Sequence, residues 1–284
     1  MIEVRDDTLM FSFPEVHPEA KCSVVFQRTL RLPEGGGPYP EPPGLGRFPI
    51  SRLVGDPGGI SGDGHGGNAL FFPMYQAEAS WIVFVGRYPF AIKVVAGRVN
   101  AITGRSLRDE RLWRPQDYVV VPRKPWMEWF CVGNGRARQF VALPLGEGVE
   151  GDSSGGECPE DNSIRITAHP MRAERYREYR RKRSEMMSLG TGLTGMSDGT
   201  GPAPSWLVHD EAWGEDYGHG AWELTAESQC CVYPVNSLSY MSYTGHCPPG
   251  RPPTVKEYRS AGLPWLEHYG EDRKVFERSR ALCS

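Results

Sequence analysis

The chain has 284 residues and a net charge of −3, so it is long enough to bury a core as one or two domains. The net charge argues against a chain-wide basic surface for nucleic acid, and no apolar run approaches the ~18 residues of a membrane-spanning helix. The charged N-terminal residues lack the apolar stretch of a signal peptide, and the seven cysteines include no C-x-x-C pair. Together these features predict a cytoplasmic protein with free thiols.

Glycine and proline punctuate the whole sequence. The 34 Gly and 25 Pro residues cluster between short β-branched and aromatic runs, a pattern typical of turn-rich β proteins. We therefore expect a mainly β fold, with an antiparallel β-sandwich or jelly-roll-like core and a smaller α+β unit at the C-terminal end. The expected divisions are a core domain at 1–148, a connecting region at 149–204 and the C-terminal unit at 205–284.

Residues 1–148 contain the clearest strand, which covers 22–32. Its even positions are apolar except for Arg28, and its odd positions are mostly polar, as in a half-buried strand. Further strands are expected at 9–13, 69–73, 81–85, 118–121, 130–132 and 137–143, and a hairpin at 90–103.

A long irregular stretch at 33–67 interrupts these strands. It contains His65 between glycines, which would let the backbone approach a ligand closely. A plain loop is the alternative interpretation.

The connecting region begins with an acidic Gly/Ser-rich loop and ends with a Gly/Ser/Thr-rich linker. Between them, a strand is expected at 164–167 and a basic helix from Pro170 to about Met187. The helix could bind an acidic partner, or it could be a solvated helix that docks through Tyr176 and Tyr179.

In the C-terminal unit, strands are expected at 222–224 and 230–233. Thr254 and Glu257 have the spacing of a capping box, which predicts a helix ending near Gly262. A second, amphipathic helix is expected at 272–283.

Polar and aromatic residues in and beside the strands suggest a ligand site. Buried arginine needs carboxylate or carbonyl partners, so such residues could read an anionic or polyhydroxylated ligand, or could form structural salt bridges. Aromatic side chains could stack on sugars or form a partner surface. With His65, the ligand-binding candidates are Arg28, Arg138, Gln139, Tyr75, Trp126 and Trp129.

A second cluster could hold a divalent metal that activates water. Imidazole and carboxylate groups are suitable ligands, but no H-E-x-x-H motif supports the site, and a polar loop is the alternative. The candidates are His209, Asp210, Asp216 and His219.

No G-x-G-x-x-G follows an expected strand, so the sequence has no dinucleotide-binding motif of the usual kind. The leading hypothesis is therefore a non-enzymatic binding protein for a small molecule, a glycan or a protein partner. One alternative is a metal-dependent hydrolase that uses the 209–219 loop, and another is a self-assembling structural protein.

Several stretches resemble a family of uncharacterised microbial proteins. The resemblance implies only that the two ends of the chain belong to one architecture, and it brings no activity or cofactor with it. The stretches are FQRTLRLP at 26–33, PPGLGRFP at 42–49, PMYQ at 73–76, RQFVALPLG at 138–146, PPTVKEY at 252–258 and GLPW at 262–265.

Overall fold

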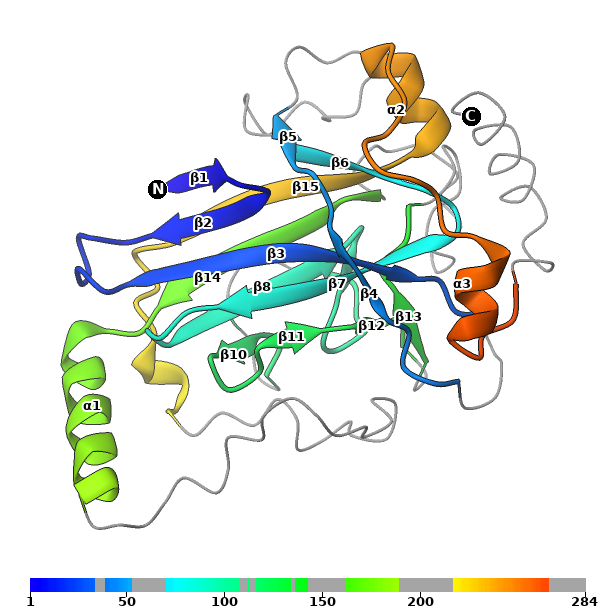
Figure 1. The fold of residues 1–284 in the computed structure, drawn as a ribbon. Coiled ribbons are helices and arrows are strands. Elements are labelled where there is room, and N and C mark those ends of the chain that lie inside the picture. Colours follow the sequence, from blue (N-terminus) through cyan, green and yellow to red (C-terminus); the bar gives the residue numbers. More distant parts are fainter. Residues whose placement is uncertain are drawn as a thin grey trace.

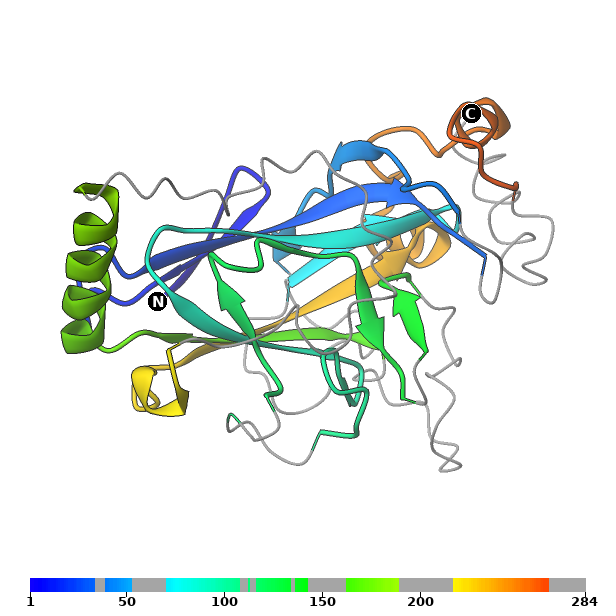
Figure 2. The same cartoon turned by 90° about the horizontal axis from the view of Figure 1, so that it is seen from below.

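Two β-sheets face each other in the computed structural model of the chain. Sheet A lies in front of sheet B in Figure 1, and Figure 2 shows the two layers in profile. The predicted mainly β fold is confirmed. The structure describes residues 1–33, 39–52, 70–107, 112, 116–133, 136–142, 162–188 and 217–265.

Sheet A is antiparallel throughout. Its strands are β1 (Ile2–Arg5), β2 (Thr8–Ser12), β3 (Lys21–Leu30), β4 (Gly44–Arg47), β7 (Glu78–Val85) and β11 (Trp126–Met127). The order across the sheet is β1-β2-β3-β7-β11, and β4 pairs with the second half of β3.

Sheet B is mixed, so the prediction of an antiparallel core is wrong at one pair of strands. Its strands are β5 (Ser51–Arg52), β6 (Leu70–Met74), β8 (Phe90–Ala96), β9 (Val99–Asn100), β10 (Val119–Val121), β14 (Ile164–Pro170) and β15 (Ser228–Asn236). The order is β10-β8-β14-β15-β6-β5, and β15 runs parallel to β6. Parallel neighbours need a long crossover connection, which a pattern of short strands does not reveal.

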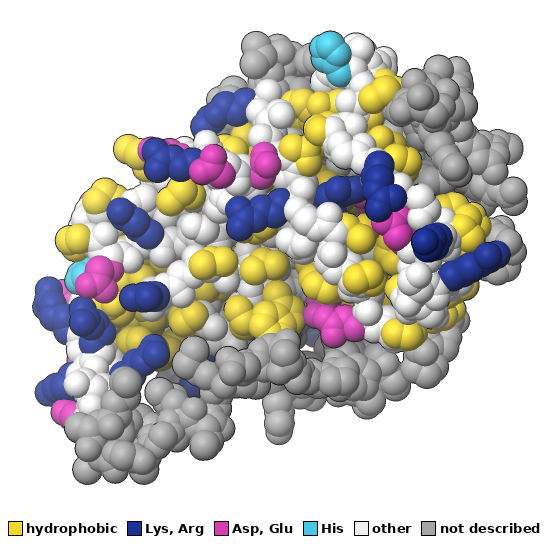
Figure 3. Space-filling view, viewed as in Figure 1, with side chains coloured by type: hydrophobic (Ala, Val, Ile, Leu, Met, Phe, Trp, Pro, Cys, Tyr) yellow, Lys and Arg dark blue, Asp and Glu magenta, His cyan; other side chains and the backbone are white. Residues whose placement is uncertain are grey.

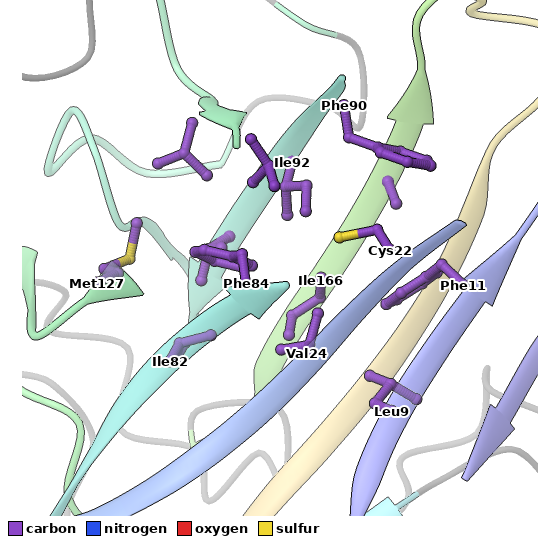
Figure 4. Close-up of a cluster of buried hydrophobic side chains, with 14 of the residues drawn as sticks. Leu9, Phe11, Cys22, Val24, Ile82, Phe84, Phe90, Ile92, Met127 and Ile166 are labelled. Atoms are coloured by element: carbon purple, nitrogen blue, oxygen red, sulfur yellow. The ribbon is translucent and has the colours of Figure 1, made fainter. Parts of the chain in front are cut away.

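The hydrophobic core fills the space between the sheets. Cys22, Val24 and Phe26, even residues of β3, lie in this core, as the alternation predicts, with side chains of β8 and β14 such as Ile92 and Ile166 (Figure 4). Phe26, Phe48 and Phe72 form a chain of packed rings, with centroids 4.6–5.0 Å apart. A short hairpin of β12 (Trp129–Cys131) and β13 (Ala137–Gln139) joins β7 through a bridge between Ser80 and Phe140.

Three α-helices and one short 3-10 helix complete the described chain: α1 (Ala173–Ser188), α2 (Ser237–Thr244), α3 (Val255–Ser260) and η3 (His219–Ala221). The capping box of Thr254 and Glu257 is confirmed at the start of α3. In contrast, α2 was not predicted, because its serine- and tyrosine-rich sequence has little helix propensity. It is held at its ends instead, by the Asn236 side chain accepting from the Ser239 N–H and by Gly245 at a φ of 70°.

Other expectations need correction. Pro170 ends β14 rather than opening the helix, and the strand expected at 222–224 is only a single bridge between Trp222 and Met171. Cys247 forms a disulfide bond, so the prediction of free thiols is wrong there, whereas Cys22, Cys131, Cys230 and Cys231 are free and buried. The helix expected at 272–283 lies outside the described residues, and so do 34–38, 53–67 and all of 189–216. The stretch at 33–67, expected to be irregular, contains the short strands β4 and β5. The domain divisions stay a prediction, although β15 lies in the middle of sheet B.

A tight contact between two loops gives a first testable prediction. Gly104 has a φ of +65°, and a Cβ there would lie 2.4 Å from the Gly133 backbone nitrogen. Gly104→Ala should therefore destabilise the protein by about 2 kcal/mol or more, since strain and clash add. Gly245→Ala, with φ +70° but open space around the Cβ, should lose only about 1 kcal/mol in urea unfolding. Equal losses would mean that the contact does not matter.

Candidate functional site

A buried ion pair lies on the inner face of sheet A, at the end of the main core. Arg28 donates from both Nε and Nη2 to Oε1 of Glu78, and Oε2 of Glu78 accepts from the Tyr75 N–H at 2.9 Å. The Glu78 side chain is only 1% exposed. Burial raises the pKa of this carboxyl, although Arg28 opposes the shift. The pair separates the main core from a smaller apolar cluster around α3.

Backbone carbonyls accept further hydrogen bonds from Arg28 and from the neighbouring Tyr75 hydroxyl. Arg28 Nη2 donates to the Arg251 carbonyl at 3.1 Å, and the Tyr75 hydroxyl donates to the Gly250 carbonyl at 3.4 Å. Arg28 Nη1 reaches the Leu45 carbonyl at 3.5 Å. The loop before α3 is thus held by Arg28 to β3 and by Tyr75 to the turn between β6 and β7.

The same end of the molecule contains a second set of buried polar contacts. The Tyr258 hydroxyl on α3 donates to the Ala77 carbonyl at 2.8 Å and accepts from the Arg31 N–H at 3.1 Å. Gln139 accepts from the Leu32 N–H at 2.6 Å and donates to the Leu30 carbonyl at 3.2 Å. These bonds tie α3 and β13 to the end of β3.

The structure therefore brings four predicted ligand residues to one end of the fold: Arg28, Tyr75, Gln139 and Trp129. The polar atoms of Arg28, Tyr75 and Gln139 make hydrogen bonds within the chain. This fits the alternative interpretation, in which the buried arginine forms a structural salt bridge. Arg138 lies half-buried on β13 opposite Phe130. His65, His209, Asp210 and Asp216 lie outside the described residues, and of His219 only the backbone, in η3, is described.

Trp126, the remaining predicted residue, lies on the outer face of sheet A. We call this surface the aromatic face, and its apolar members are Met10, Val25, Trp81, Val83, Val85 and Trp126. They belong to none of the three buried clusters. Val25, Val83 and Trp126 lie opposite one another in a row across β3, β7 and β11. Trp126 is 37% exposed and Val85 is 56% exposed. Figure 3 shows hydrophobic side chains gathered over the middle of sheet A.

Polar and charged side chains surround the aromatic face. Gln27 lies opposite Trp81, and Ser23 lies opposite Val85. Arg47 donates to the Thr8 hydroxyl at 3.3 Å, and the Lys124 ammonium lies 6.0 Å from the centre of the Trp126 ring. Burial lowers the pKa of Lys124. The face thus combines flat aromatic surface with hydrogen-bonding groups, which suits binding.

Of the residues of this face, only Trp126 was predicted as a ligand-binding candidate. The sequence nevertheless contains a signal for the face, in the strand at 81–85. Trp81-Ile82-Val83-Phe84-Val85 has no polar residue at either parity, whereas a strand with one solvated face should alternate. Such a strand is normally covered on both faces. Here the odd residues form an apolar surface on the outside of the sheet.

Buried charges also occur on the outer face of sheet B. Lys93 is 1% exposed and lies 3.0 Å from the Asp117 carboxylate. Close by on β14, His169 is 2% exposed; its Nε2 lies 3.8 Å from the Glu227 carboxylate, and neither ring nitrogen makes a hydrogen bond. Burial, assisted by Lys93, lowers the pKa of His169 to about 4. The imidazole is therefore neutral at physiological pH, and protonating it in acid would place a charge inside the sheet.

The basic helix α1 packs through its tyrosines. The Tyr176 ring lies 4.1 Å from the Tyr88 ring, and its hydroxyl donates to Glu19. Its basic residues are exposed and interleaved with glutamates, as in the Arg175–Glu178 pair at 3.1 Å. This arrangement fits the interpretation of α1 as a solvated, docked helix.

Comparison with known proteins gives no family. The chain matches no protein-family model, no curated protein and no solved structure. Among the described residues, no helix is long and apolar enough to span a membrane, and no group of three or more metal-ligating side chains occurs. The resemblance to uncharacterised microbial proteins stays a prediction.

Proposed function

We propose that the protein is a non-enzymatic binding protein and that the aromatic face of sheet A holds its ligand. The observation that supports this is the apolar surface around Trp126, which lies outside the buried clusters of the fold. The largest contiguous apolar patch on a monomeric protein is often a functional surface. We also propose that the facing sheets form a β-sandwich, because side chains from the inner faces of both sheets pack in one hydrophobic core.

Two other functions remain alternatives. A metal-dependent hydrolase would depend on His209, Asp210, Asp216 and His219, for none of which the structure describes a side chain. A self-assembling protein would use the aromatic face against a second copy, and light scattering over a wide concentration range tests this directly. The aromatic face favours binding, since it presents flat aromatic surface on which a ligand can stack.

Replacing Trp126 by alanine tests the proposed function. The variant should lose most binding to whichever probe the parent binds, because a tryptophan that anchors a binding surface can contribute about 2 kcal/mol or more. The probes are neutral glycans, acidic glycans, single-stranded oligonucleotides and phospholipid vesicles, measured by calorimetry or co-sedimentation.

The matched control is Leu224→Ala, which removes an apolar side chain that is 43% exposed and lies outside sheet A. Its binding should equal that of the parent. If no probe binds, or if both variants bind like the parent, the aromatic face is not a binding surface.

A further inference from the structure

We infer that the ligand of the aromatic face is a neutral, chain-like glycan. The inference rests on the proposed function and adds the class of ligand. It is carried by the exposed area of the face, its charge balance, and the way its polar groups alternate with its tryptophans.

The exposed area is small for a protein partner. Only Val85 and Trp126 expose more than a third of their surface, and Val25 is 6% exposed beneath its neighbours. With aromatic side chains covering ~150–250 Å² each, the exposed apolar area is on the order of 300 Å². A stable protein interface buries about 800 Å² on each partner. The face is therefore suited to a narrower ligand.

Charge balance argues against a polyanion. Of the charged residues on and around the face, four are basic and three are acidic, so their net charge is only +1. Nucleic acids and acidic polymers depend on a clear excess of cations, whose contacts dominate their affinity. The charged residues are Arg5, Lys21, Arg47 and Lys124 against Glu3, Asp6 and Glu128.

The polar groups of the face suit hydroxyl ligands. Gln27 lies directly across from Trp81, and Thr8 lies beside the row of Val25, Val83 and Trp126. Opposite residues on neighbouring strands are ~5 Å apart, so stacking surface and hydrogen-bonding groups alternate across the sheet at that spacing. Amide and hydroxyl groups both donate and accept hydrogen bonds, as sugar hydroxyls do.

The form of the surface indicates a chain rather than a single sugar. A recess of about 260 Å³ is lined by Ile2, Arg52, Leu70 and Gln229, among others, and neither Trp81 nor Trp126 lines it. Small ligands are usually enclosed in concave sites. A chain lying flat can instead gather weak contacts over several strands.

The experiment measures binding of the full chain to amylose, glycogen, mixed-linkage β-glucan, xylan, cellulose and chitin, with polygalacturonate and oligo-dT as charged comparators. We expect binding to at least one neutral glycan, changing less than twofold between low and high salt. Trp126→Ala should weaken it about tenfold or more, and Gln27→Ala several-fold. Leu224→Ala, outside sheet A, should bind like the parent.

The outcomes separate the two proposals. If only the charged polymers bind, with salt sensitivity and with loss in both Trp126→Ala and Lys21→Gln/Arg47→Gln, the glycan inference is overturned while the proposed function stands. If the chain binds itself and no glycan, the inference is also overturned, and self-assembly takes its place. If a neutral glycan binds but Trp126→Ala binds it like the parent, the site lies elsewhere and both proposals fail.

Discussion

Replacing Glu78 by alanine should destabilise the protein by about 3–5 kcal/mol, because it leaves the Arg28 guanidinium largely buried without its carboxylate. The Tyr75 N–H loses its acceptor at the same time. Both effects act where β3, β7 and the loop before α3 meet, so the small apolar cluster around Tyr258 should loosen with them. Urea unfolding followed by circular dichroism measures the loss.

Two comparisons make this result specific. Glu178→Ala breaks the exposed Arg175–Glu178 pair on α1 and should lose well under 1 kcal/mol. The double variant Arg28→Met/Glu78→Leu removes both charges and should recover a large part of the loss, since well-packed apolar residues can replace a buried pair. A loss below 1 kcal/mol in Glu78→Ala would show that the pair is not a structural link.

Local sequence patterns predicted those features of the fold that depend on residues close together in the sequence. The alternation in β3 gave the inward-facing residues, and the Thr254–Glu257 spacing gave the start of α3. The pairing of strands far apart in the sequence could not be predicted from local patterns. The parallel pairing of β15 with β6 joins residues about 160 positions apart, and nothing within either strand specifies it.

The candidate site shows the same division. Arg28 was recognisable as the one charge among inward-facing apolar residues, but its partner Glu78 lies 50 residues away and looks like any strand-end glutamate. Trp126 was a candidate only because it is aromatic. Its position beside Val83 depends on the pairing of β11 with β7. Whether Trp81 or Val83 faces solvent depends on what covers the sheet, which no local pattern records.

Acidification should destabilise the fold through His169. Its folded pKa, about 4, lies below the ordinary 6.5, so the unfolded chain binds the proton more tightly. Stability from this group is present above pH 6.5 and is lost as the pH falls from 6.5 toward 4. Linkage gives a loss of about 2 kcal/mol at pH 5 relative to neutral pH. Phenylalanine has a similar shape and no proton to gain, so His169→Phe should remove this part of the acid sensitivity.

The measurement compares the pH dependence of urea unfolding in the parent, His169→Phe and His246→Phe. His246 lies on the surface, where water reaches its ring, so its variant should follow the parent. Carboxyls whose pKa is lowered in the fold, such as those of Glu223 and Glu257, also lose stability in acid, but they are common to all three proteins. The difference between parent and His169→Phe therefore isolates the imidazole. If the curves of the parent and of His169→Phe stay parallel from pH 7 to pH 5, His169 does not cause the acid sensitivity. An NMR titration in which its ring protonates near pH 6.5 would then show that water reaches the ring through the outer face of sheet B.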